Sequence, residues 1–175
     1  DAAVNAAFAA QDLFQQRLLG AGREALAALE RSAEPAVILV GRPYNLYDRN
    51  SNCDIPRKLR SLYGVNVLPL DFLPLDDQSV DRFADNLYWY SGRRILAAGL
   101  FARLRERVHL IYITNFKCGP DSFVKHFMRP ATGSPFLLLQ FDGHGNDAGY
   151  LTRCEAYLDS KGILRCDSAA QTQKA

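Results

Sequence analysis

The apolar run Ala36-Val37-Ile38-Leu39-Val40, which ends at Gly41, decides the fold of this chain. A continuous run of β-branched and apolar residues predicts a strand that is buried on both faces, because a strand with one wet face would alternate between apolar and polar residues. Strands of that kind occur in parallel sheets that helices cover on both sides. We therefore expect this strand to lie at the centre of a parallel sheet.

Strand and helix patterns alternate along the rest of the chain. The sequence predicts further strands at 65–70, 108–114 and 136–140, and helices at 54–63, 79–106, 121–128 and 147–160. Two glycines weaken the helix at 79–106, so it is kinked or divided. Residues 5–31 form one or two helices, with a break near Gly20 or Gly22. The whole predicts a doubly wound, flavodoxin-like α/β fold: a mostly parallel sheet of four strands or slightly more, helices on both faces, and an N-terminal helical lead-in.

Composition limits the classes of protein to which the chain can belong. It has 175 residues, of which 48% are hydrophobic, and a net charge of +2 with scattered Lys and Arg. We expect an N-terminal helical segment at 1–34, an α/β domain at 35–162 and a flexible tail at 163–175. The charge pattern argues against nucleic-acid and membrane partners, and no apolar stretch is long enough to span a bilayer. We expect a cytoplasmic protein and, because no initiator Met is present, a piece of a longer polypeptide.

Three polar loops each follow an expected strand, at 41–45, 115–122 and 142–149. The carboxyl ends of parallel strands meet at one edge of a sheet, and ligands bind in the crevice there. Arg42, Tyr44 and Lys117 are candidates for binding a phosphorylated or CoA-linked substrate, although Arg42 is equally suited to pairing with a carboxylate. His144 and Asp147 are candidates for substrate binding, with Asp147 also suited to capping the final helix.

The four cysteines, Cys53, Cys118, Cys154 and Cys166, show no C-x-x-C spacing and are expected to be free thiols. Cys118 is the most interesting, because it lies between Asn115 and Gly119 in the second loop. A glycine lets the backbone approach a ligand closely. Cys154 falls in an expected helix, where a cysteine is most often a small core residue.

Several motifs of this chain resemble those of a known family. They are 40–49 (VGRPYNLYDR), 54–60 (DIPRKLR), 112–123 (YITNFKCGPDSF), His144, 147–149 (DAG) and 152–156 (TRCEA). On these motifs the chain resembles the CoA-substrate-specific enzyme activase-related proteins, which belong with the 2-hydroxyacyl-CoA dehydratase component family. The resemblance covers most of residues 37–160.

The resemblance implies a fragment, of a C-terminal type, from a large iron–sulfur protein. Its partners would be the other domains of that protein and an ATP-dependent activase component. Cys118 matches the cysteine of the family's Cys-Gly-Pro-Asp-Ser loop, which makes it a candidate metal ligand of a [4Fe–4S] cluster, with Asn115 and Gly119 beside the cofactor. The other cluster cysteines are not found here, so we expect the cluster in the full-length parent and none retained by the fragment. The implied role is ATP-coupled electron transfer or 2-hydroxyacyl-CoA-type dehydration, with no catalysis by the fragment alone.

Two alternatives remain open from the sequence. The chain is a metal-free, flavodoxin-like module that binds a CoA-linked or phosphorylated small molecule, or it is a structural docking domain. In both, Cys118 is a reduced cysteine without a metal.

Overall fold

A four-stranded parallel sheet forms the centre of the molecule in a computed structural model that describes residues 1–115, 117–143 and 146–164. The strand order is β2-β1-β3-β4. The strands are β1 (Ala36–Gly41), β2 (Asn66–Pro69), β3 (Val108–Asn115) and β4 (Leu137–Phe141). All six residues of β1 are buried, and this strand pairs with both β2 and β3. The prediction of a central buried strand is confirmed.

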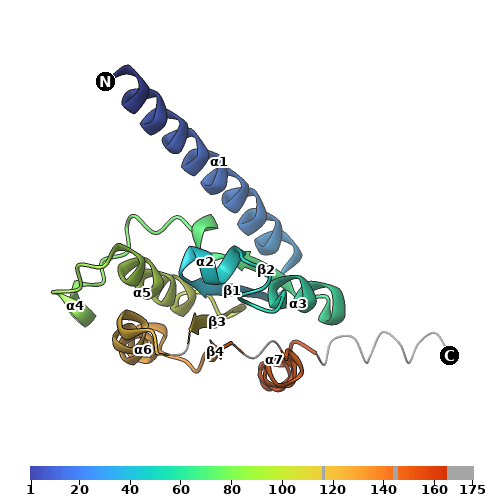
Figure 1. Ribbon diagram of the computed structural model, residues 1–175. Coiled ribbons are helices and arrows are strands. Elements are labelled where there is room, and N and C mark those ends of the chain that lie inside the picture. The colour runs from blue at the N-terminus through green and yellow to red at the C-terminus, as the bar shows by residue number, and fades with distance from the viewer. Residues whose placement is uncertain (116, 144–145, 165–175) are drawn as a thin grey trace.

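Helices cover both faces of the sheet. In Figure 1, α5 (Tyr90–Arg103) and α6 (Gly119–Thr132) lie to the left of the sheet, whereas α3 (Ile55–Tyr63) and α7 (Ala148–Ser160) lie to the right. Short elements complete the chain: α2 (Pro43–Tyr47), the 3-10 helix η1 (Leu70–Phe72) and α4 (Asp81–Ala84). The arrangement confirms the doubly wound, flavodoxin-like α/β fold.

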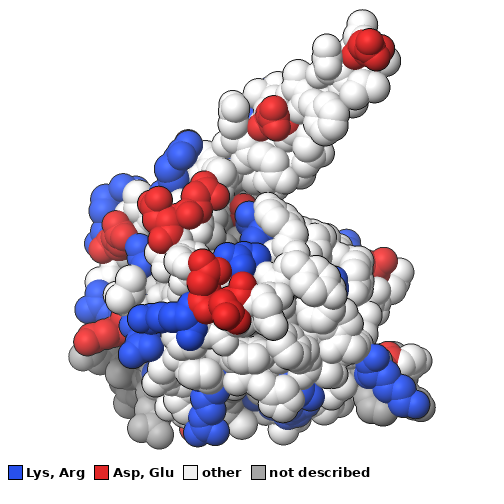
Figure 2. Space-filling view, turned by 90° about the vertical axis from the view of Figure 1, so that its left-hand side faces the viewer, with Lys and Arg blue, Asp and Glu red and all other residues white. Residues whose placement is uncertain are grey.

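The N-terminal helix α1 (Ala2–Ser32) is continuous and projects from the body of the domain (Figure 1 and Figure 2). The predicted break near Gly20 or Gly22 is wrong. Gly22 is buried against η1, and a Cβ atom at this position would lie 1.9 Å from the carbonyl oxygen of Phe72. This glycine therefore permits a close approach between two segments, and it does not end the helix.

The helical pattern expected at 79–106 is divided into α4 and α5, one of the two forms that the sequence allowed. The division falls before the two glycines, which both lie inside α5. Added Cβ atoms at Gly92 and Gly99 would lie 3.0 Å from Val124 and 3.3 Å from Thr132 on α6. The glycines thus allow α5 and α6 to pack closely.

Helix α6 is longer than the predicted 121–128. It begins at Gly119 and continues through Pro130 to Thr132, where Gly133 ends it in a left-handed conformation with φ of 65°. Of the tail expected at 163–175, residues 165–175 lie outside the described part of the chain. Within the described residues, every helix is too short or too polar to cross a membrane.

Candidate functional site

The loops after β1, β3 and β4 leave the same edge of the sheet. Gly41 at the end of β1 pairs with Ile113, and Asn115 at the end of β3 pairs with Phe141 of β4. The chain runs from β1 to β2 on one side and from β3 to β4 on the other. The boundary between β1 and β3 is therefore the topological switch point, where open α/β sheets bind their ligands.

A buried carboxylate, Asp121, ties the two sides of this boundary together. Its side chain is 2% exposed and accepts a hydrogen bond from Arg42 Nε at 3.0 Å and one from Thr114 Oγ1 at 2.5 Å. Arg42 follows β1, Thr114 lies on β3 and Asp121 is in the first turn of α6. One side chain thus fixes three elements around the switch point. Sequence reasoning did not select Asp121 as a site residue.

Arg42 therefore pairs with a carboxylate, the second of the two roles expected for it. Burial lowers the pKa of Arg42, but the nearby negative groups, chiefly Asp121 through its charge and hydrogen bond, together raise it by more, so the pKa of Arg42 is raised. The two terminal amino groups of Arg42 make no hydrogen bond within the described residues. Tyr44 lies beside the pair with 53% of its surface exposed, and burial of its hydroxyl raises its pKa.

Cys118 is the N-cap residue of α6, and its backbone carbonyl accepts the first helical hydrogen bond from Ser122 N at 2.9 Å. It is half-buried and forms no disulfide. The turn before it is tight, because Cys118 N donates to Asn115 O at 3.2 Å while Lys117 adopts a left-handed φ of 61°. A non-glycine residue in that conformation is uncommon and is often found at functional sites.

The described residues do not make a complete metal site. Fe–S clusters are commonly held by four thiolates, whereas no group of three or more His, Cys, Asp or Glu side chains in the described ranges could hold a metal ion. Cys118 fits as a single ligand at most. The space beside it is open, since a Cβ atom added at Gly119 would have no heavy atom within 4 Å.

A shallow cavity of about 390 Å³ lies on the rim of the same edge. Asn115 lines it, together with Ser51 from the loop after α2 and Phe141, Asp142 and Gly143 from the end of β4. Of the predicted site residues, Asn115 is the last residue of β3, and Lys117, Cys118 and Gly119 lie directly after it. His144 lies outside the described residues.

Asp147 takes the N-cap position of α7, as expected, but its carboxylate does not cap the helix. It forms an ion pair with Lys58 of α3, and Lys58 Nζ also donates to the carbonyl oxygen of Cys53 at 2.7 Å. The hydrogen bond from Lys58 lowers the pKa of Asp147. Asp147 is therefore a link between α3 and α7.

The other cysteines differ in their surroundings. Cys154 is fully buried, and this burial raises its pKa to about 12, as a core cysteine requires. Cys53 is half-buried and precedes α3 with a left-handed φ of 52°. Cys166 lies outside the described residues.

Two buried polar side chains near the switch point were not anticipated. The side-chain nitrogen and oxygen of Asn45 have no hydrogen-bond partner among the described residues, and the same is true of the hydroxyl of Tyr112. Both residues are at most 1% exposed. Burial and the nearby charge of Asp121 raise the pKa of Tyr112. Buried polar groups are usually paired, so unpaired polar atoms between α2 and β3 are unusual for a hydrophobic core.

One comparison with known proteins bears on these residues. Residues 1–73 match the model of the family described as CoA enzyme activase uncharacterised domain (DUF2229). The match supports a relationship with the CoA enzyme activase family. It includes Arg42 and Tyr44 and ends before β3, so it does not reach Cys118. No curated protein and no solved structure matches the chain.

Proposed function

We propose that this chain is a domain of a CoA-enzyme-activase-related iron–sulfur protein, in which Cys118 provides one ligand to a [4Fe–4S] cluster. The remaining ligands come from other domains of the parent or from a partner subunit. When bound, such a cluster supplies one-electron transfer, here in ATP-coupled reduction or in 2-hydroxyacyl-CoA-type dehydration. An ATP-dependent activase component is the proposed partner, and the isolated chain is not catalytic.

The position of Cys118 carries this proposal. The thiol lies at the amino end of a 14-residue helix, at the switch point of the sheet. Amide groups at the start of a helix favour a nearby anion, which suits a thiolate ligand. Asp121 holds the loop that presents Cys118, because it connects the first turn of α6 to Thr114 and Arg42. The activase-family match over residues 1–73 supplies independent support for the parent protein.

The test is a cysteine substitution in the full-length parent, purified without oxygen and reconstituted with iron and sulfide. Cys118→Ser should lower the bound iron and sulfide and change the EPR spectrum of the reduced protein. The matched control is Cys53→Ser, because Cys53 is also half-buried but precedes a different helix. Equal iron and sulfide contents in the wild type and Cys118→Ser would remove Cys118 from the ligand set.

A second function, binding of a phosphorylated or CoA-linked small molecule without a metal, is favoured by the side chains beside Cys118. Arg42 has terminal amino groups that make no hydrogen bond with described residues, and Tyr44 is exposed next to them. A guanidinium in this state is suited to a phosphate. Lys117, His144 and Asp147 complete the set of proposed ligand-binding residues.

Calorimetric titration of the chain with CoA distinguishes the two functions. Saturable binding that Tyr44→Ala weakens at least about tenfold, equivalent to about 1.4 kcal/mol, would favour the small-molecule module. No heat of binding at millimolar CoA would argue against the small-molecule module. The cluster proposal and a purely structural docking role would then remain, and the iron and sulfide contents of the reconstituted parent distinguish these two.

A further inference from the structure

The outer edges of the two edge strands, β2 and β4, have different surroundings. Along β4, three carbonyl oxygens accept side-chain hydrogen bonds from one face of α7. The pairs are Tyr157 Oη to Pro135 O (3.4 Å), Arg153 Nη2 to Leu138 O (2.6 Å) and Tyr150 Oη to Gln140 O (3.1 Å). Covering an edge strand in this way discourages another chain from pairing with it.

The edge of β2 has no such cover. Its residues pair with β1 on one side, and the backbone groups that point to the other side make no hydrogen bond within the described residues. Pro69 has no N–H, so the open groups of this four-residue strand are the N–H and carbonyl of Val67 and the carbonyl of Pro69. Unpaired backbone groups of this kind form a template for a further strand.

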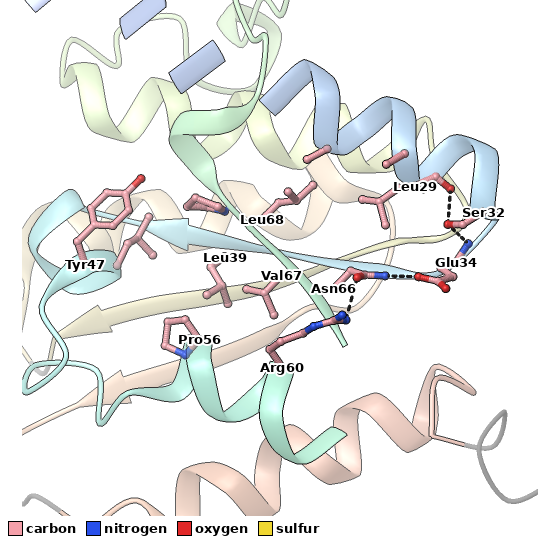
Figure 3. Close-up of a pocket in the computed structure, with 14 residues that line it drawn as sticks. Leu29, Ser32, Glu34, Leu39, Tyr47, Pro56, Arg60, Asn66, Val67 and Leu68 are labelled. Carbon is pink, nitrogen blue, oxygen red and sulfur yellow. Dashed lines mark hydrogen bonds between the residues drawn. The ribbon is translucent and has the colours of Figure 1, made fainter. Parts of the chain in front are cut away.

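A cavity of about 710 Å³ opens along this uncovered edge. Figure 3 shows β2 crossing it, with α1 on one side and α3 on the other. One wall carries the small residues Ala25 and Ala28 with Leu29, and the opposite wall carries Pro56 and Arg60. Most of the lining residues are apolar. Helices α1 and α3 lie on opposite sides of the β2 edge, in the same way that helices cover both faces of the inner strands.

The shape of this cavity suits an extended peptide. A strand added at the normal spacing of about 4.8 Å from β2 would send alternate side chains toward α1 and toward α3. Its backbone would satisfy the open groups of β2, which a helix or an acyl chain cannot do. Apolar side chains at alternate positions would then cover the alanines and Leu29 on one side and Pro56 on the other.

The charge of Arg60, at one end of the cavity, sets a requirement for the residue that binds beside it. Arg60 donates through Nη1 to Gly64 O at 2.8 Å and to Asn66 Oδ1 at 3.0 Å, and no carboxylate of the described residues pairs with it. Glu34 is the one carboxylate among the described residues that line the cavity, and it accepts a hydrogen bond from Asn66 Nδ2 at 2.7 Å. Figure 3 places these three polar residues together, away from Tyr47 at the other end. An acidic side chain on the incoming strand would complement Arg60.

We propose that β2 binds an extended segment of a partner protein, which adds a fifth strand to the sheet between α1 and α3. The segment carries apolar residues at alternate positions and an acidic residue next to Arg60. Strand addition of this kind takes its affinity from the main chain and its specificity from alternate side chains. The proposed strand site lies on a different edge of the domain from the Cys118 loop.

The probe is a phage-displayed library of random linear peptides, selected against the complete chain. We expect enrichment of peptides with alternating apolar residues and an Asp or Glu near one end. A synthetic peptide of the enriched sequence should slow hydrogen exchange at the amide of Val67, whose N–H points away from β1, whereas the amide of Leu68 faces β1. No enrichment, or enriched peptides with apolar residues at helical spacing, would overturn the proposal.

Two variants locate the binding. Ala28→Trp fills the cavity and should weaken the peptide at least tenfold. Ala21→Trp is the matched control, because it is exposed two turns earlier on the same helix and does not line the cavity. Thermal unfolding must show that both variants fold. Binding that survives Ala28→Trp would exclude the site.

Arg60→Glu tests the charge requirement without filling the cavity. Selection against this variant should replace the acidic residue of the peptides with Lys or Arg, and unchanged peptides would contradict the assigned role of Arg60. Sedimentation of the chain alone provides a further check. Self-association that Ala28→Trp abolishes would mean that a second copy occupies the edge, which would overturn the assignment to a partner protein.

Discussion

Two ion pairs tie the loops of the rim together, and they differ in burial. In the pair Arg42–Asp121, the guanidinium is 19% exposed and the carboxylate 2%. In the pair Lys58–Asp147, the corresponding side chains are 25% and 36% exposed. The first pair, together with the hydrogen bond from Thr114, connects β1, β3 and α6 at the switch point, whereas the second connects α3 to α7 beside β4.

The difference decides how firmly each side of the rim is held. A buried charge that loses its partner is left without solvation, so the surrounding structure is strongly constrained to keep the pair. An exposed pair gains little, because water and salt already solvate its members. The side of the rim that presents Cys118 is thus the fixed side, and the side around Asp147 is free to adjust.

The strongest test removes the buried carboxylate. Asp121→Ala should lower the free energy of unfolding by about 2–4 kcal/mol, because Arg42 and Thr114 both lose their acceptor. Urea unfolding measures this loss. Asp121→Asn is the control, since it keeps the size of the side chain and one acceptor oxygen, and it should cost less. A loss below about 0.5 kcal/mol for Asp121→Ala would mean that the pair does not hold the rim.

A double-mutant cycle compares the pairs directly. Arg42→Met combined with Asp121→Asn should give a coupling free energy of about 0.5–3 kcal/mol, the range found for residues in one hydrogen-bond or salt-bridge network. The cycle of Lys58→Met with Asp147→Asn should give a smaller coupling, because that pair is only half-buried and water reaches it more easily. Equal couplings would remove the distinction between a fixed and an adjustable side.

The architecture could be predicted because its signals are local. The apolar run at 36–40 predicts a buried strand, and the helix predicted at 54–63 is present as α3, which Gly64 ends in a left-handed conformation with φ of 68°. The break expected near Gly20 or Gly22 was wrong because the role of Gly22 is set by a contact that is distant in the sequence. What that glycine does depends on the backbone of Phe72, which lies 50 positions later and cannot be inferred from spacing.

The candidate site was predictable in position and less so in its contacts. Strand-end loops identified Arg42 and Cys118, but the partner of Arg42 lies 79 positions away in the chain. An acidic residue such as Asp121 is common in the first turn of a helix, because its charge interacts favourably with the helix dipole. The sequence alone therefore does not reveal that Asp121 is a buried hydrogen-bond acceptor. The pairing of Lys58 with Asp147 joins segments 89 positions apart and was hidden in the same way.

Salt gives a smaller effect that sharpens the comparison. Asp147→Asn should change the melting temperature by less than about 2 °C in dilute buffer, and about 0.5 M NaCl should abolish even this difference, because accessible charges are screened at that ionic strength. This variant leaves the hydrogen bond from Lys58 to the carbonyl of Cys53 in place. The effect of Arg42→Met, measured by the same thermal scans, should persist in salt. A salt-resistant loss in Asp147→Asn would place that pair in a less accessible environment than its exposure indicates.

The smallest expected effect is a pH dependence on the exposed side of the rim. The hydrogen bond from Lys58 holds the pKa of Asp147 below its unfolded value of about 3.9. Folding therefore favours the ionised carboxylate, which stabilises the protein above the unfolded pKa, and the contribution is lost as the pH falls through the lower folded pKa. The difference in urea midpoint between the wild type and Asp147→Asn should thus be constant from about pH 7 to pH 5 and disappear in stronger acid. A difference that grows on acidification would show that protonated Asp147 is the favoured form, and the contact with Lys58 would then have to be broken in solution.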